Sequence, residues 1–292
     1  MRSVPIVAAF VALTAAAVSH AAPFERTVAA EPKGSVEISN VSGRVSVTGW
    51  DRSEVQVRGE LGNAVERVDV SSNGSRTIIR VVLPRQTGWR NGSADLDVRV
   101  PEQCALDVSV VSATLQTSRL LGPQRLSSVS GDIRAELGGA NFEGKTVSGD
   151  LLLAGNARPS DIRLSTISGD IVLQKSAGEV DATTVSGDLQ LELNPASSVR
   201  MRTTSGDLTL RGSLSKGATV DAQTVSGEVT LRARGGFEFE ATSFSGDIKN
   251  CFGAKADSSR HGPGQRLSGT TGDGEGRVRV KSMSGDVEIC DR

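Results

Sequence analysis

The sequence of 292 residues has no tyrosine, two tryptophans and seven phenylalanines. Aromatic rings are the platforms on which nucleic-acid bases stack, so this composition argues against a stacking surface for bases or sugars. Acidic and basic residues nearly balance, with 34 Asp and Glu against 33 Lys and Arg. A nucleic-acid partner would require a basic stripe, and we therefore expect no nucleic-acid partner.

Histidine is almost absent. His20 falls in a predicted signal peptide, which leaves His261 alone in a glycine-rich stretch. A Ser–His–Asp triad or a histidine-based zinc site would depend on that one side chain. The glycines are spaced along a repeat and not clustered, so no phosphate-binding loop is expected. We therefore expect no catalytic residues, no metal ligands and no cofactor.

Long apolar runs are confined to the N-terminus. Ile6 to Val18 is apolar but too short to span a bilayer as a helix, and Ser19-His20-Ala21 fits a small-x-small cleavage site. Residues 1–21 are therefore predicted to be a secretory signal peptide. No cysteine follows for a lipid anchor, and no later run suggests a transmembrane segment. The expected location is the periplasm or the extracellular space.

What the sequence does contain is a repeat. The stretch Thr184-Val185-Ser186-Gly187-Asp188-Leu189 recurs with small changes, and its serines from Ser130 to Ser245 are separated by 18, 20, 18, 19, 21 and 19 residues. The equivalent serines are Ser130, Ser148, Ser168, Ser186, Ser205, Ser226, Ser245 and Ser284. A fixed period near 20 residues is the signature of a solenoid.

Numbering each repeat from its serine as position 0 places apolar residues at −6, −4, −1, +3 and +5. Residues two apart on a strand share a face. Because −4 to −1 is an odd step, we expect a bend near −3 and −2 and a second strand from about −1 to +5. Turn-rich stretches such as 154–159 follow. Rungs stacked about 4.8 Å apart would merge these columns into one core. The predicted fold is an all-β, single-stranded parallel β-helix with rungs of about 19 residues.

Two columns form the predicted turns of the repeat. Positions +1 and +2 are Gly131 and Asp132, Gly149 and Asp150, Gly169 and Asp170, Gly187 and Asp188, Gly206 and Asp207, Gly227 and Glu228, Gly246 and Asp247, and Gly285 and Asp286. Glycine at +1 indicates either a positive φ or a lack of room for Cβ. The acids should form an outer column that caps backbone N–H groups at the bend.

Two other functions stay open for the acid column. A cation-binding solenoid is one, although calcium takes six to eight oxygens and each rung offers a single acid. A carbohydrate-active β-helix, hydrolase or lyase, is the other, because carboxylates about 5 Å apart match a retaining glycosidase pair. A catalytic site would require one rung to differ from the others, whereas this pattern repeats the acid at +2 in all of these rungs.

The chain divides into three parts. After the signal, residues 22–101 are expected to hold a first rung, Val36 to Val47 with Arg44 in place of the acid, and then an antiparallel segment without the repeat that caps the N-terminal end. Residues 102–292 are expected to hold the β-helix repeats, beginning with a weak rung at Ser112. Within them, residues 254–276 are nearly free of large apolar side chains and are predicted to be a long loop.

Three cysteines are present. Cys251 and Cys290 both occupy position +6 of rungs that are consecutive in this register. Stacking would place their Cα atoms about 5 Å apart, within disulfide range, and export would provide an oxidising compartment. We therefore predict a Cys251–Cys290 disulfide that ties down a last rung with a neighbour on one side only. Cys104 is expected to be a free, partly buried thiol.

The Ser-Gly-Asp rungs, Gly49-Trp50-Asp51 and Val98-Arg99-Val100-Pro101 resemble the bacterial putative-adhesin β-strand-repeat family. The resemblance extends from about Val36 to the end of the chain. It implies a β-helix in an envelope or secreted protein of a family with unassigned function, and it brings no catalytic residues. The expected function is a non-enzymatic adhesin, envelope-structural or surface-binding role toward an unidentified envelope or surface component.

Overall fold

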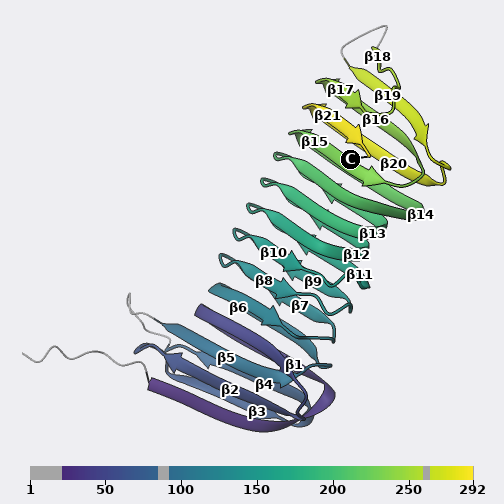
Figure 1. The fold of residues 1–292 in the computed structure, drawn as a ribbon. Helices are drawn as coiled ribbons and strands as arrows, with labels where there is room; N and C mark the ends of the chain where they lie inside the picture. Colours follow the sequence, from purple (N-terminus) through teal and green to yellow (C-terminus); the bar gives the residue numbers. More distant parts are fainter. Residues whose placement is uncertain (1–21, 85–91, 259–263, 292) are drawn as a thin grey trace, which may run out of the picture.

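The computed structural model describes residues 22–84, 92–258 and 264–291, and the regular structure in these ranges is all β (Figure 1). In chain order the strands are β1 (Ala22–Trp50), β2 (Glu54–Leu61), β3 (Arg67–Ser72), β4 (Gly74–Val82), β5 (Ser93–Pro101), β6 (Ala105–Ser118), β7 (Gln124–Ser127), β8 (Ile133–Glu136), β9 (Phe142–Lys145), β10 (Leu151–Ala154), β11 (Pro159–Ser165), β12 (Ile171–Thr183), β13 (Leu189–Arg202), β14 (Leu208–Ser226), β15 (Val229–Arg234), β16 (Phe237–Ser245), β17 (Ile248–Asn250), β18 (Asp257–Ser258), β19 (Gln265–Thr271), β20 (Gly276–Ser284) and β21 (Val287–Cys290). Across these ranges, no helix has the length and apolarity needed to cross a bilayer.

Successive rungs pair in parallel at equivalent positions of the repeat. Leu151 of β10 pairs with Ile133 of β8 on one side and with Ile171 of β12 on the other. Ile171 pairs in turn with Leu189 of β13. This register produces the elongated stack of Figure 1, and the predicted all-β solenoid is confirmed.

The core consists of side chains that stack from rung to rung. The column at position −6 is Val36, Leu106, Gln124, Phe142, Ile162, Val180, Val199, Val220, Val278 and Phe239, all buried. The column at +3 is Val45, Leu115, Ile133, Leu151, Ile171, Leu189, Leu208, Val229, Val287 and Ile248, also buried. Each rung buries its apolar face only against its neighbours, so the stack stabilises residues that a single rung would leave in water.

The corner of each rung lies at positions −1 and 0, and the prediction of a bend near −3 and −2 was wrong. Side chains face inward at −6, −4 and −2 before the corner and at +3 and +5 after it, as the burial of Leu126, Ser128 and Ile133 shows. The column at −1 is exposed, with Val129 at 44% and Val185 at 46%. The predicted burial of this column was also wrong, because the polar residue at −2 takes the inward place.

At the N-terminal end, the rungs are not stacked in chain order. Ile38 of β1 pairs in parallel with both Val108 of β6 and Ile79 of β4, while β5 pairs in parallel with the second half of β1. The segment predicted to lack the repeat therefore supplies an additional rung, divided between β4 and β5. Antiparallel pairs are also present, between β2 and both β1 and β5, and between β3 and β4, which form a hairpin.

The C-terminal end shows the same kind of insertion. Val278 of β20 lies between Val220 of β14 and Phe239 of β16, and β21 lies between β15 and β17. The last rung of the sequence therefore has a neighbour on both sides, which corrects the prediction of one neighbour. Residues 254–276, predicted to be a loop, contain β18 and β19, and β19 pairs antiparallel with β16.

The column at position −5 gives a physical reason for this order. In stack order its residues are Glu37, Asp107, Arg125, Glu143, Arg163, Asp181, Arg200, Asp221, Arg279 and Glu240. From Asp107 onward the sign of charge alternates at every step. Stacking in chain order would place Asp221 directly against Glu240, and like charges opposite one another are destabilising. The inserted rung brings Arg279 between these two acids.

Candidate functional surface

The acid column lies beside the corner, where six of its eight carboxylates bond to a neighbouring rung. Asp170 Oδ1 accepts a hydrogen bond from the backbone N–H of Asp188 at 2.9 Å, and Asp188 Oδ1 accepts one from that of Asp207 at 2.8 Å. The same bond joins Asp132 to Asp150, Asp150 to Asp170, Asp207 to Glu228 and Asp286 to Asp247, over 2.8–3.3 Å. Each of these acids therefore accepts an N–H group that the bend directs toward it.

Arg44, which departs from the acid column, takes part in the same pattern. Its backbone N–H donates to Asp95 Oδ1 at 3.0 Å, and its guanidinium pairs with Asp95 Oδ2 at 3.3 Å. Asp95 belongs to the rung formed by β4 and β5. Sequence reasoning missed it because Ser93-Ala94-Asp95 has alanine where the repeat has glycine.

The glycine column lies against the backbone of the neighbouring rung. A Cβ on Gly206 would lie 2.1 Å from the carbonyl oxygen of Gly187, and one on Gly149 would lie 2.4 Å from that of Gly131. Gly206 also has a φ of +147°, which side chains disfavour. Both reasons given by the sequence therefore apply at Gly206, whereas Gly149 shows the crowding alone, and the crowding comes from stacked backbone.

A column of buried hydroxyl groups at position −2 was missed in the sequence. Its residues are Ser128, Thr146, Thr166, Thr184, Thr203, Thr224, Ser243 and Ser282. Thr184 Oγ1 donates to the carbonyl oxygen of Gly169 at 3.4 Å, and Ser243 Oγ donates to that of Gly285 at 3.0 Å. The signal was present, because all eight rungs from Ser130 onward have Ser or Thr at this position.

The exposed column at −1 forms a continuous line along the corner, which we call the corner ridge. In stack order it comprises Val41, Val111, Val129, Val147, Ile167, Val185, Thr204, Val225, Met283 and Phe244. Its nine apolar members are 39–59% exposed. Backbone bonds such as Ser148 N–H to the carbonyl of Val129, at 2.9 Å, hold successive rungs in register here. The ridge is therefore a fixed apolar line on the surface.

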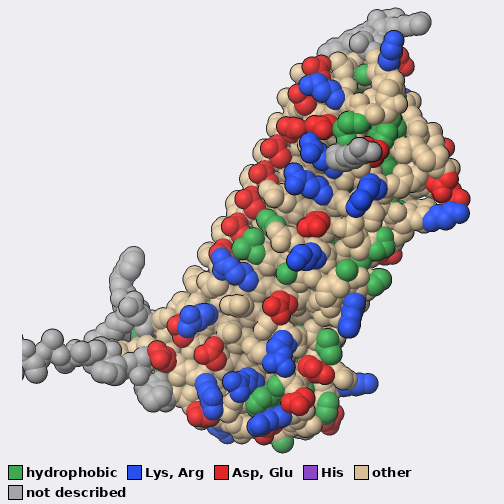
Figure 2. Space-filling model, in the orientation of Figure 1, with side chains coloured by type: hydrophobic (Ala, Val, Ile, Leu, Met, Phe, Trp, Pro, Cys, Tyr) green, Lys and Arg blue, Asp and Glu red, His purple; other side chains and the backbone are tan. Residues whose placement is uncertain are grey.

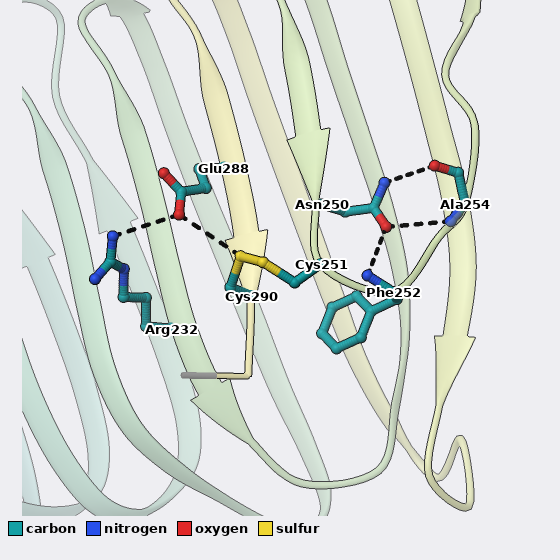
Figure 3. The surroundings of a disulfide bond; sticks show 7 residues. All are labelled: Arg232, Asn250, Cys251, Phe252, Ala254, Glu288 and Cys290. Atoms are coloured by element: carbon teal, nitrogen blue, oxygen red, sulfur yellow. Dashed lines mark hydrogen bonds and ion pairs between the residues drawn. A yellow bond between two sulfur atoms is a disulfide. The ribbon is translucent and has the colours of Figure 1, made fainter.

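The predicted disulfide is confirmed, with 4.9 Å between the Cα atoms of Cys251 and Cys290 (Figure 3). Beside it, Asn250 holds the following turn: its Oδ1 accepts from the N–H groups of Phe252 and Ala254, and its Nδ2 donates to the carbonyl of Ala254. The bond joins β21 to the turn after β17, across neighbouring rungs.

Cys104 is free, as predicted, and it is fully buried where partial burial was expected, with 1% of its surface exposed. Burial raises the pKa of its thiol to about 12. Since the thiolate is the reactive form, Cys104 is an inert core residue at neutral pH.

Charged pairs occupy the outer faces of the rungs. Glu143 lies between Arg125 and Lys145, and hydrogen bonds from these two cations lower the pKa of its carboxyl. Arg76 does the same to Glu37, through bonds of 2.7 Å. In the part of the chain that the structure describes, no group of three or more His, Cys, Asp or Glu side chains could hold a metal ion. His261 lies outside the described residues.

The stacked fold and its repeated Ser-Gly-Asp corners define a parallel β-solenoid. The family model of Toastrack DUF4097 matches residues 26–290, and the chain belongs to this family. The predicted family resemblance is thereby confirmed.

Solved structures similar to this chain include three described as a putative adhesin or a putative cell adhesion protein. A putative adhesin from Parabacteroides distasonis is 11% identical, with a TM-score of 0.49, 92% of this chain covered and 98% of that one. A putative adhesin from Bacteroides fragilis is 9% identical, with a TM-score of 0.40 and coverage of 92% and 97%. A putative cell adhesion protein from Clostridium sporogenes is 10% identical, with a TM-score of 0.24 and coverage of 92% and 99%. No curated protein matches the chain.

Proposed function

We propose that the protein is an exported, non-enzymatic β-solenoid with an adhesive or envelope-structural role carried by its outer faces. The observation that carries this proposal is the recurrence of the same surface columns in successive rungs. A catalytic site would require one rung to differ in its acids, whereas here six equivalent carboxylates make the same backbone bond. A long, repeated surface suits contact with another extended surface.

Export is supported by the chemistry of Cys251 and Cys290. Disulfides form and persist in oxidising compartments, and this one joins two adjacent rungs of the fold. The predicted signal peptide, residues 1–21, lies outside the described residues. The proposal places the protein in the periplasm or outside the cell.

The two ends of the stack are closed by antiparallel strands in this proposal. At the C-terminal end, Leu267 of β19 is buried, and Gly269 passes over the ring of Phe239, where a Cβ would lie 2.5 Å from the ring. At the other end, β2 and β3 make the antiparallel pairs. Covering both ends limits edge-to-edge association, which leaves the sides of the solenoid as its binding surface.

The test is a binding assay on envelope fractions. Beads coated with the purified protein are mixed with peptidoglycan sacculi, outer-membrane vesicles or whole cells, and retained beads are counted. We expect retention on at least one of these surfaces, and less retention when the protein has been unfolded by heat with its disulfide reduced.

Albumin-coated beads provide the matched control for nonspecific adsorption. A protein that releases soluble sugar from any of these fractions, or that is retained no better than albumin on all of them, would contradict the proposal. The first of these results would favour the carbohydrate-active alternative.

A further inference from the structure

The corner ridge is an apolar line with two unlike borders. On one side is the acid column at +2, in which Asp150, Asp170, Asp188 and Asp207 each use one oxygen to accept a backbone N–H. No ion pair to any of these four acids is present among the described residues. Figure 2 shows a row of acidic side chains along one edge of the stack.

The other border, at position −3, contains basic residues and no acidic ones. Lys145, Arg202 and Lys281 occupy it in three rungs, and all three are exposed. The remaining rungs have uncharged polar residues there: Ser39, Ser109, Ser127, Ser165, Thr183, Gln223 and Thr242. The ridge therefore separates an acidic column from a column that contains cations and no acids.

The spacing of the ridge restricts what can pack along it. Its side chains repeat at the strand separation of about 4.8 Å, whereas side chains on one face of an extended peptide repeat at about 6.8 Å. A helix advances about 5.4 Å per turn. Over ten rungs, only another stack of β-strands keeps its side chains in step with the ridge, and the chain itself provides such a stack.

The available area is sufficient for a weak dimer. Nine steps of about 4.8 Å make the ridge about 43 Å long, and five residues of about 3.3 Å separate position −3 from +2, a strip about 17 Å wide when measured along the chain around the corner. The product, at most about 700 Å² per copy, is close to the 800 Å² per partner of a standard interface.

We propose that the corner ridge is the contact surface for a second copy of this chain, with the two solenoids side by side and parallel about a twofold axis along the ridge. In this arrangement each ridge residue faces its own equivalent. Each acid column faces the partner's column at −3, so that Asp150 is opposite the partner's Lys145, and Asp207 is opposite the partner's Arg202. An antiparallel arrangement would place the two acid columns against each other.

Engineered cysteines test the contact and its orientation together. The native thiols do not interfere, since Cys104 is buried and the other two are bonded. Val129→Cys, Ile167→Cys and Val185→Cys are each expected to give a disulfide-linked dimer on a non-reducing gel. Gln190→Cys, exposed on the face beyond the corner, is the control for random collision and should not. An antiparallel dimer would link at one of the three ridge positions at most, which would overturn the orientation.

Sedimentation of the unmodified protein gives the second measurement. We expect a reversible dimer with a dissociation constant on the order of 10 µM. The dimer of the triple variant Val147→Thr, Ile167→Thr, Val185→Thr should have a dissociation constant at least tenfold higher. Thr204 occupies the same column, so the fold accommodates threonine there, and an unchanged melting curve checks this. A wild-type protein that is monomeric at about 100 µM, a triple variant that dimerises as well as the wild type, or ridge cysteines that link no faster than Gln190→Cys would each refute the proposal.

Discussion

Replacing one glycine of the +1 column should destabilise the solenoid for two reasons that can be separated. In Gly206→Ala, the new Cβ would lie 2.1 Å from the carbonyl oxygen of Gly187, and the residue would keep a φ of +147°. A backbone in such a region costs roughly 1–3 kcal/mol for a residue with a side chain. Forcing an extra carbon into packed structure costs roughly 1–3 kcal/mol more. We expect a loss of about 4 kcal/mol in the free energy of unfolding.

Two further glycines provide matched controls for the two causes. Gly149 has the close contact, 2.4 Å to the carbonyl of Gly131, but its φ lies outside the range of +20° to +160° that disfavours side chains, so Gly149→Ala measures crowding alone. Gly217 has a φ of +70°, and a Cβ added there would meet nothing within 4 Å, so Gly217→Ala measures the backbone strain alone. Each of these two variants should lower the free energy of unfolding by about half as much as Gly206→Ala.

Thermal or denaturant unfolding followed by circular dichroism measures all three variants. At roughly 2–4 °C per kcal/mol for a chain of this size, Gly206→Ala should lower the melting temperature by about 8–16 °C. A melting temperature within about 2 °C of the wild type would refute the argument, as would a Gly217→Ala variant that is as unstable as Gly206→Ala.

Three more outcomes follow from the other columns and from the cysteines. Asp170→Ala, which leaves the N–H of Asp188 without its acceptor, should lower the free energy of unfolding by about 1–2 kcal/mol, and Asp170→Asn should lower it less. Millimolar calcium should leave the melting temperature of the wild type unchanged. Burial raises the pKa of Cys104 from 9.0 to about 12. The contribution of the protonated thiol to the free energy of unfolding is therefore complete below pH 9 and lost toward pH 12. Iodoacetamide should label Cys104 at pH 8 only after unfolding. Cys251→Ser with Cys290→Ser, which opens a link spanning 39 residues, should lower the free energy of unfolding by up to about 4 kcal/mol, measured by denaturant titration.

The sequence predicted the features that depend on the repeat itself. A fixed spacing between equivalent serines is enough to place Leu151 against Ile133 and Ile171, because identical rungs stack in register. It also placed Cys251 beside Cys290, since both occupy +6 and their rungs are neighbours. These inferences needed no knowledge of which way any corner turned.

The direction of side chains at the corner could not be obtained in the same way. The odd step between −4 and −1 required a bend, but hydrophobicity favoured burying Val185 over Thr184, and the structure does the reverse. Thr184 is inside because its hydroxyl bonds to the carbonyl of Gly169, which satisfies a polar group that the bend leaves without a strand partner. A buried threonine column is therefore the consequence of the corner, and it leaves the valine column exposed.

The order of rungs at the two ends depends on contacts between side chains of rungs that are not consecutive in the chain. Nothing in the spacing of the repeat indicates that β20 lies between β14 and β16, because each rung has the same apolar columns and would stack on any other. The charges at −5 distinguish the arrangements: Arg279 between Asp221 and Glu240 gives two favourable cross-strand neighbours, each worth roughly 0.2–1 kcal/mol, where chain order would give one repulsive pair. A uniform core thus makes the stack possible, and the less uniform outer columns select its register. The same outer columns determine which surface is left for a partner.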